Sequence, residues 1–228
     1  MNKKENYLGI KRLLEKSIDI FDGNIVFLSS FGAEDMVILH VMLSEGFDIP
    51  IHTIDTGRLF QETYDLMEEV RIRYKVNVRI FFPNNSELEG FISLKGPNSF
   101  YFSAENRHRC CAIRKVEPLG RAIEGFKAWI TGVRADQTKV RMLMDEIEPD
   151  PLHNGIFKVN PLLRWTFSDV VSFLHEYNVP YNPLIDQGFV SIGCEPCTRA
   201  VKQGEDERAG RWWWEQGIKE CGLHIARE

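Results

Sequence analysis

Apolar and polar positions along the chain predict helices and strands in alternation. In the first twenty residues the apolar side chains recur at helical spacing, near one face: Leu8, Ile10, Leu13, Leu14, Ile18 and Ile20. Short apolar runs then predict buried strands at residues 24–29, 49–55, 76–82 and 127–133. Helices are predicted between these strands at residues 36–45, 61–74 and 110–124, and a long loop at residues 83–108.

This order of elements indicates the fold class. Short strands separated by helices are typical of an α/β fold with a doubly wound, mostly parallel sheet. The last third, from about Pro161, is predicted to be helical and rich in loops, and to end in a mobile tail. With 228 residues, the chain is expected to form a single domain, with an α/β core at 1–160 and a helical part at 161–228.

Composition and charge narrow the classes of function. The 28 Lys and Arg residues and the 33 Asp and Glu residues give a net charge of −5, and 43% of the residues are hydrophobic. These proportions exclude a disordered chain, and the acidic balance argues against a general nucleic-acid binder. No run approaches the roughly 20 apolar residues of a membrane span, and the charged amino terminus does not have the pattern of a signal peptide. We therefore expect a cytoplasmic protein with reduced thiols.

Three of the predicted strands end in turns with polar side chains, at residues 29–35, 55–58 and 132–134. Ligands of doubly wound sheets bind beyond the carboxyl ends of the strands. The first turn leads into a helix, where backbone N–H groups, a glycine and hydroxyl side chains can hold a phosphate. An ordinary strand-to-helix turn would have the same local sequence, but two such turns at adjacent strand ends favour a nucleotide pocket.

The five cysteines form two pairs and one lone residue. Cys110 and Cys111 are adjacent, Cys194 and Cys197 have the C-x-x-C spacing, and Cys221 lies near the end of the sequence. Two pairs supply the four thiolates of a zinc site or of a [4Fe–4S] cluster. Ligand sites on the cluster are spread more widely, which suits adjacent cysteines, whereas structural zinc is the more common occupant, so both stay open.

Cys221 is the candidate nucleophile, because only a thiolate attacks efficiently and Lys219 and His224 are close to it in the sequence. A surface thiol without a role is the alternative. Cationic residues gather in the middle and last parts of the acidic chain: Arg114, Lys115, Arg121, Arg134, Lys139, Arg141, Arg208 and Arg211. A locally positive pocket predicts an anionic substrate, such as a phosphate or sulfate, although solvated surface positions would also explain the arginines.

Eight segments that contain these residues resemble, in order, those of a known family. They are residues 29–35 (SSFGAED), 53–58 (TIDTGR), 110–119 (CCAIRKVEPL), 131–134 (TGVR), 181–184 (YNPL), 191–199 (SIGCEPCTR), 208–215 (RAGRWWWE) and 220–224 (ECGLH). The chain resembles the assimilatory adenylyl-sulfate (APS) reductases of bacteria and plants, which are relatives of the 3′-phospho-APS (PAPS) reductases. The last two segments are highly specific, whereas the loop at 136–141 matches poorly.

The resemblance implies an adenine nucleotide α-hydrolase-like fold and a [4Fe–4S] cluster bound by Cys110, Cys111, Cys194 and Cys197. It implies that Cys221 attacks the sulfur of APS, releases AMP and becomes a thiosulfonate, from which thioredoxin or a similar dithiol reductant releases sulfite. The reaction belongs to sulfate assimilation and cysteine biosynthesis. The residues carried over as substrate contacts are Ser29, Ser30, Gly32, Glu34, Asp35, Thr53, Asp55, Thr56, Gly57, Arg58, Lys115, Gly132, Arg134, Arg141, Arg208, Arg211 and His224.

Three other functions stay open. The paired cysteines are typical of APS-specific members of the family, but a PAPS reductase or an enzyme of dual specificity is the nearest alternative. An ATP-using relative would carry a Ser-Gly-Gly-x-Asp-Ser loop, a pattern that Phe31 and Ala33 break. A non-enzymatic metal-binding regulator would have no use for Cys221. No nucleic-acid or membrane partner is expected, and assembly of identical chains is compatible with the sequence.

Overall fold

The structure is a computed structural model that describes residues 3–138 and 140–215 of the chain. Its central sheet is formed by β1 (Ile25–Leu28), β2 (Ile51–Ile54), β3 (Val78–Phe81), β4 (Ala128–Ile130), β5 (Ile147–Pro149) and β6 (Phe157–Val159). The strand order is β3-β2-β1-β4-β6-β5, and neighbouring strands are parallel except for β5 and β6. The predicted α/β fold with a mostly parallel sheet is confirmed.

Helices connect the strands as the sequence predicts for most of the chain. The α-helices are α1 (Lys3–Ile20), α2 (Ala33–Ser44), α3 (Gln61–Tyr74), α4 (Asn85–Lys95), α5 (Ala104–Cys111), α6 (Glu117–Ile123) and α7 (Phe167–Glu176). The helices expected in the first twenty residues and after the first two strands are confirmed. Helix α2 begins three residues earlier than expected, so Glu34 and Asp35 belong to its first turn.

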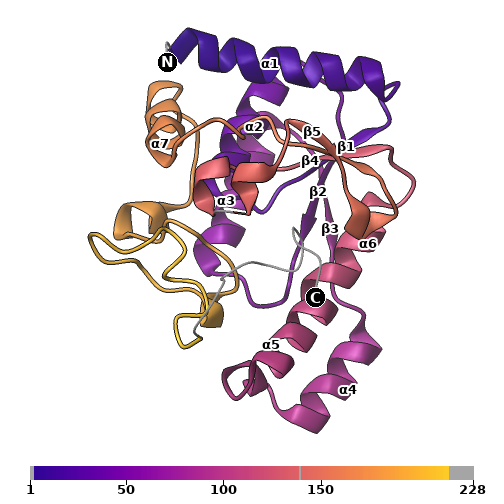
Figure 1. Cartoon of the computed structure of the whole chain (residues 1–228), viewed down its shortest axis with the longest axis vertical. Coiled ribbons are helices and arrows are strands. Elements are labelled where there is room, and N and C mark those ends of the chain that lie inside the picture. The colour runs from indigo at the N-terminus through magenta and orange to yellow at the C-terminus, as the bar shows by residue number, and fades with distance from the viewer. Residues whose placement is uncertain (1–2, 139, 216–228) are drawn as a thin grey trace.

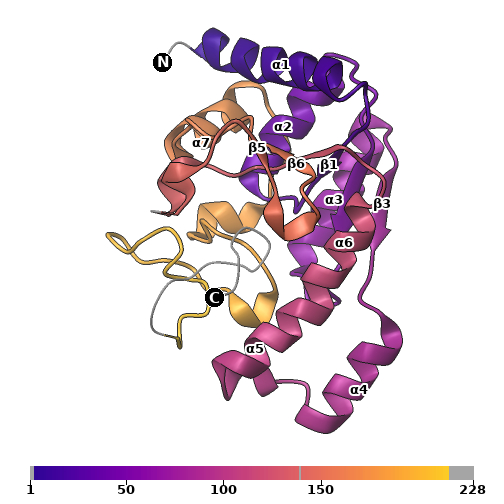
Figure 2. The ribbon, with the colours of Figure 1, turned by 45° about the vertical axis from the view of Figure 1, so that its right-hand side comes forward.

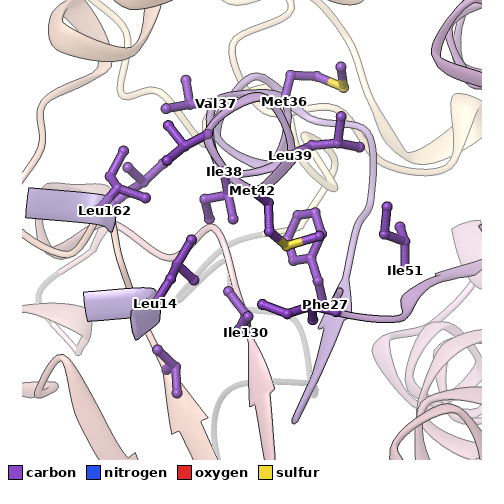
Figure 3. Packing of buried hydrophobic residues seen from close by; sticks show 14 of the residues in the cluster. Leu14, Phe27, Met36, Val37, Ile38, Leu39, Met42, Ile51, Ile130 and Leu162 are labelled. Carbon is purple, nitrogen blue, oxygen red and sulfur yellow. The ribbon is translucent and has the colours of Figure 1, made fainter. Parts of the chain in front are cut away.

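Alternate side chains of β1 pack against helices on opposite faces of the sheet. Ile25 and Phe27 belong to the larger core, which α1, α2, α3 and α7 complete, whereas Val26 packs with α6 on the other face. Figure 3 shows the larger core around α2, with Ile38 and Met42 among its packed side chains. Helix α2 is apolar on most sides, and eight of its twelve residues are buried.

The order of the strands reverses beside β1. The chain proceeds outward from β1 through β2 to β3, then returns through α5 and α6 and enters β4 on the opposite side of β1. A doubly wound sheet binds ligands at such a switch point, outside the carboxyl ends of its strands. The topology therefore predicts a ligand site at the turns that follow β1 and β4.

Residues 83–108 were expected to form a long loop, and this expectation is wrong. They contain α4, a 3₁₀-helix (Ser99–Tyr101) and part of α5. Helix α4 buries none of its residues, so no apolar period reveals it. Helices α4 and α5 form the end of the molecule farthest from α1 (Figures 1 and 2). Helix α5 continues through a π-helical turn (Ala112–Val116) into α6, so the predicted helix at 110–124 is part of a longer helical rod.

Strands β5 and β6 were not predicted: each has three residues, as β4 has, but β4 is wholly apolar, whereas β5 and β6 each contain a charged residue. Strand β5 ends in Pro149, and in β6 the charged Lys158 is buried while Phe157 is exposed, so neither strand gives the apolar run that marks β1 and β4. After β6 the chain forms α7 and then loops and short 3₁₀-helices beside the carboxyl ends of the strands (Figure 1).

None of the described helices combines the length and apolar character that a membrane span requires. The division of the single domain into an α/β core at 1–160 and a helical part at 161–228 stays a prediction.

The start of α2 lies close to the end of β4 because residue 132 is a glycine. The Asp35 carboxylate accepts hydrogen bonds from the backbone N–H and the hydroxyl of Ser30, at 2.6 and 2.7 Å. A Cβ atom at position 132 would lie 2.3 Å from Asp35 Oδ1 and 2.9 Å from Glu34 Cβ. Any larger residue would therefore push the two strand-end turns apart.

We expect Gly132→Ala to lower the free energy of unfolding by about 1–3 kcal/mol, because the added methyl group overpacks this contact. Gly120→Ala in α6 is the matched control, since nothing lies within 4 Å of a Cβ atom there, and alanine should stabilise the helix by up to about 1 kcal/mol. Urea unfolding measures both variants. Wild-type stability of Gly132→Ala would contradict the close approach of the two turns.

Candidate functional site

A cavity of about 210 Å³ lies at the switch point, at the carboxyl ends of β1 and β4. We call it the anion cavity. The predicted substrate contacts that line it are Ser29, Ser30, Gly32, Glu34, Asp35, Thr56, Lys115, Gly132, Arg141, Arg208 and Arg211. The fold thus brings together, around one cavity, residues as far apart in the sequence as Ser29 and Arg211.

The turn between β1 and α2 forms one wall of the anion cavity. Phe31 is 1% exposed and has a φ of 58°, a left-handed conformation that bulky side chains rarely adopt. Its backbone N–H donates to the Ser29 hydroxyl at 3.1 Å. Gly32 is the N-cap of α2 and provides no side-chain cap, so the first N–H groups of the helix stand at this wall, where an anion is favoured.

Four cationic side chains line the anion cavity. Lys115 comes from the π-helical turn, Arg141 from a 3₁₀-helix (Arg141–Leu143), and Arg208 and Arg211 from the loop after the second cysteine pair. The three arginines are only 5–6% exposed. The described lining residues include just two carboxyl groups, so the anion cavity carries a net positive charge.

Arg211 is held in place by its neighbours. Its Nη1 lies 3.4 Å from both the Ser191 hydroxyl and the Ile192 carbonyl, and its guanidinium lies 4.9 Å from the centroid of the Trp212 ring. Gly193 leaves room for this guanidinium, because a Cβ atom at position 193 would lie 2.3 Å from Arg211 Nη2 and would displace it. Within the described chain, the buried Nε of Arg211 has no hydrogen-bond partner. An anion in the cavity would supply the acceptor that this donor needs.

A second cavity, of about 10 Å³, is lined by all four paired cysteines, and we call it the thiol cavity. Cys110 and Cys111 end α5, whereas Cys194 and Cys197 come from a short 3₁₀-helix and its N-cap. The remaining lining residues are Arg58, Phe100, Arg107, Arg114, Lys115 and Pro196. These residues include four cationic side chains and no carboxylate, so they favour a negatively charged occupant.

Burial and neighbouring charge act in opposite directions on these thiols. Burial raises the pKa of Cys110 and, together with the nearby Cys194, raises the pKa of Cys197 to about 12. Burial also acts to raise the pKa of Cys194, but Lys115, the Thr56 hydroxyl and two arginines outweigh it, and the pKa is lowered. Of these three thiols, Cys194 is therefore the one whose thiolate the surroundings favour.

The surroundings of the thiol cavity fit a negatively charged group bound through sulfur. Trp212, in the same buried cluster as Cys194 and Cys197, is 1% exposed, and Arg107 lies 4.6 Å over its ring. The buried indole Nε1 of Trp212 has no hydrogen-bond partner among the described residues, as a donor to a cluster sulfur would require. At the present spacing, no three His, Cys, Asp or Glu side chains in the described ranges could hold a metal ion. The cofactor itself thus stays a prediction.

Thr56 and Lys115 connect the two cavities. Thr56 lines the anion cavity, and its hydroxyl accepts a hydrogen bond from Cys194 Sγ at 3.3 Å. The backbone N–H of Glu195 donates to the Arg58 carbonyl at 2.8 Å. Lys115 lines both cavities. The turn after β2, which the sequence predicts as a nucleotide contact, is therefore also the wall between the anion cavity and the thiol cavity.

Four of the predicted contacts in and after β2 do not line the anion cavity. Thr53 is buried in the sheet, and Arg58 lines the thiol cavity instead. Asp55 is used within its own turn, where it accepts hydrogen bonds from the Gly57 N–H at 2.7 Å and from the Tyr64 hydroxyl at 2.9 Å. These residues support the wall without reaching the space that a ligand would fill.

Arg134 is also absent from the lining of the anion cavity, because its side chain is fully buried behind the wall and pairs with carboxylates. Cys221 and His224, together with Lys139, lie outside the described residues. The sequence did not single out Gln137 and Ser191, which both line the anion cavity. Ser191 lies within a family-like segment, and this was the only signal that could have found it.

The fold and the two cavities define a class of protein: a doubly wound α/β protein with a cationic ligand cavity at its switch point and four thiols beside it. Residues 24–200 match the model of the phosphoadenosine phosphosulfate reductase domain. The chain belongs to this family, that of the APS and PAPS reductases, as its motifs predicted.

Curated relatives extend the match over most of the chain. The adenosine 5′-phosphosulfate reductase of Burkholderia cepacia is 48% identical over 202 residues, which cover 88% of this chain and 80% of the relative. The protein of the same name from Allochromatium vinosum is 47% identical over 202 residues, which cover 88% of this chain and 78% of that relative.

Solved structures support the fold. The phosphoadenylyl-sulfate (PAPS) reductase of Candida auris, in a phosphate complex, is similar with a TM-score of 0.71 and 31% identity, over 84% of this chain and 90% of that one. The FMN adenylyltransferase of Candida glabrata in complex with ATP is similar with a TM-score of 0.58 and 18% identity, over 99% of this chain and 75% of that one. This second likeness concerns the fold alone.

The pKa of the Asp35 carboxyl group is raised above the usual value for an aspartate. Burial, the largest effect, raises its pKa from 3.8 to about 7, and the charge of Glu34 adds to the rise, while hydrogen bonds from Ser30 and Gly132 oppose it. The folded state therefore binds the Asp35 proton more tightly than the unfolded chain does. Asp35 must lower the stability of the fold as the pH rises from about 4 to about 7.

We expect Asp35→Asn to remove this dependence. Between pH 4.5 and 7 the wild type should lose free energy of unfolding relative to the variant, at about 1.4 kcal/mol per pH unit at most, and the difference should level off above pH 7. Urea unfolding across this pH range measures it, with the exposed Asp48→Asn as the control that follows the wild type. Parallel curves for the wild type and Asp35→Asn would contradict the raised pKa.

Proposed function

We propose that this chain reduces APS to sulfite and AMP, in the assimilation of sulfate into cysteine. The curated relatives at 47–48% identity support this function by their names, and a net positive cavity at the switch point supports an anionic nucleotide. The observation that carries the proposal is the position of Lys115, which lines both the anion cavity and the thiol cavity. One ammonium group thereby joins the space for the nucleotide to the four thiols.

The reaction begins with attack by the Cys221 thiolate on the sulfur of APS. A bond forms between this thiolate and the sulfur, the bond from that sulfur to the bridging phosphate oxygen breaks, and AMP leaves. Cys221 then carries a thiosulfonate group. A thiolate of thioredoxin or a similar dithiol attacks the Cys221 sulfur and releases sulfite, and the second thiol of the reductant resolves the mixed disulfide. The reductant supplies the two electrons and ends as a disulfide.

The cations of the anion cavity make this attack feasible. The sulfate group of APS is negatively charged and repels a thiolate, so positive charge at the transferring group stabilises the transition state. Lys115, Arg141, Arg208 and Arg211 supply that charge. The turn after β1 binds the phosphate and adenosine portion, which the reaction leaves intact. Phosphate is a weak base, so AMP leaves without a strong general acid.

The four paired cysteines would hold a [4Fe–4S] cluster. When bound, this cluster supplies a fixed charge that shapes the field around the sulfate, with no change in its oxidation state. The chain contributes the thiols, the Trp212 N–H and the Arg107 guanidinium over the indole ring. A reducing compartment such as the cytoplasm would keep the thiols available.

PAPS is the alternative substrate. The observation that favours it is the similarity to the PAPS reductase of Candida auris at 31% identity. The relatives named for the APS reaction are closer in sequence, so we assign APS as the main substrate. The relative kcat/KM for the two nucleotides distinguishes an APS enzyme from one of dual specificity.

We expect APS, added without reductant, to leave one SO₃ group on Cys221, because the second step needs a dithiol. Mass spectrometry of the intact protein and of its peptides measures the adduct, and adding a dithiol should release it as sulfite. Cys221→Ser should gain no adduct and form no sulfite. If this variant formed sulfite at the wild-type rate, the proposed nucleophile would be refuted.

We expect the anaerobically purified protein to be brown and to contain about four iron and four sulfide ions per chain. Cys194→Ser should lose most of both, because it removes a ligand thiol. Cys221→Ser is the matched control and should keep them. Iron and sulfide analysis with an absorbance spectrum gives the answer independently of activity, and zinc in an active wild-type protein would overturn the cofactor assignment.

A further inference from the structure

Arg134 is buried at the junction of three segments of the chain. Its side chain is 0% exposed, and each of its three guanidinium nitrogens contacts a different carboxylate. Nε lies 2.9 Å from Glu34, Nη1 lies 2.5 Å from Asp136, and Nη2 lies 2.6 Å from Glu207. Glu34 belongs to the first turn of α2, and Glu207 is 73 residues away in the carboxyl-terminal loop. Arg134 therefore ties the strand-end turns to that loop.

The partners of Arg134 lead to two arginines of the anion cavity. Glu34 Oε1 also accepts a hydrogen bond from Gln137 Nε2 at 3.0 Å, and Gln137 Oε1 accepts one from Arg141 Nη1. On the other side, Glu207 is followed directly by Arg208 in the sequence. The Arg134 guanidinium is thus linked to Arg141 through the side chains of Glu34 and Gln137. It is linked to Arg208 through the Glu207 side chain and the peptide bond that follows Glu207.

The loop around Arg208 is compact, so a displacement at Glu207 must move its neighbours. The backbone N–H of Arg208 donates to Asp206 Oδ1 at 2.8 Å, and the N–H of Arg211 donates to the Arg208 carbonyl at 3.0 Å. The pairing of Glu207 with Arg134 anchors this compact loop to the core. This ion pair therefore helps to position Arg208, the cavity arginine that follows Glu207 directly.

Arg134 does not serve as a direct ligand of the substrate in this arrangement. Each of its three guanidinium nitrogens faces a carboxylate, and three carboxylates around one cation leave no positive charge for an anion. The residue is also absent from the lining of the anion cavity. We propose that Arg134, with Glu207 and Gln137, positions Arg208 and Arg141 for the anionic nucleotide. This role rests on the proposed function, in which that nucleotide is APS.

The test compares two glutamates of the same loop. Glu207→Gln weakens the pair with the fully buried Arg134, whereas Glu205→Gln weakens a pair, 2.8 Å apart, with Arg199, whose side chain is 33% exposed. The two glutamates themselves are similarly exposed, at 34% and 30%. We expect Glu207→Gln to raise the KM for APS by about fivefold to twentyfold and to lower kcat as well, because Arg208 and Arg141 contact the nucleotide and also supply charge to the transition state. Glu205→Gln should leave both values unchanged. A wild-type KM for a folded Glu207→Gln protein would overturn the proposal.

A double-mutant cycle separates positioning from general loss of structure. If Glu207 acts through Arg208, its substitution should change KM by less than twofold once Arg208→Gln is present. Gln137→Met, alone and with Arg141→Gln, tests the other branch in the same way and does not depend on the folding of Glu207→Gln. Additive effects in both cycles would contradict the positioning role, whatever the stability of the variants.

Binding of ADP makes the outcome independent of the reaction. The β-phosphoryl group of ADP replaces the sulfonyl group of APS, and calorimetry measures its affinity without turnover. Weaker ADP binding by Glu207→Gln, but not by Glu205→Gln, would support the positioning role even if the wild type formed no sulfite. Sulfite formation by the wild type with equal ADP affinities of both variants would instead refute the positioning role and leave the proposed function intact.

Discussion

Positive charge in a confined space is the constraint on which both cavities depend. Removing a guanidinium or an ammonium from water costs several kcal/mol unless its neighbours compensate. The structure compensates with groups that leave the positive field in place: the Trp212 ring beside Arg211, and the neutral Gln137 beside Arg141. Three carboxylates pair with Arg134 behind the wall, and of these only Glu34 also lines the anion cavity. The anion cavity therefore stays cationic inside a protein whose net charge is −5.

The sequence predicts the fold where burial produces a pattern and fails where it does not. Strands β1, β2 and β4 and helices α1 and α2 are recognised from their apolar residues, because they are buried in the clusters that pack on the two faces of the sheet. Strand β3 is recognised from its apolar residues as well, although two of its four residues are exposed. Helix α4 projects away from that core and buries no residue, so it has no apolar stripe. Strands β5 and β6 are short and contain the charged Glu148 and Lys158, so they lack the apolar run by which the equally short β4 is recognised.

The candidate site was predictable as a set of motifs but not as an arrangement. Residues after β1 and β4 could be placed because the carboxyl ends of parallel strands share one edge of the sheet. Whether an arginine faces the cavity or lies behind it depends on contacts such as that between Arg134 and Glu207, which local sequence does not encode. Neutral polar residues such as Gln137 and Ser191 line the cavity without any charge or spacing that marks them. The π-helical turn that carries Lys115 likewise has no sequence signature.

Lys115 makes the occupancy of the two cavities interdependent. An occupant that changes the position of this ammonium in one cavity changes the affinity of the other cavity for its own occupant, and the same factor must apply in the reverse direction. Filling the anion cavity would then change the affinity of the thiol cavity for its occupant, and this change is an equilibrium effect that acts equally in both directions. A substitution that displaces Lys115 would therefore alter the anion cavity and the thiol cavity together.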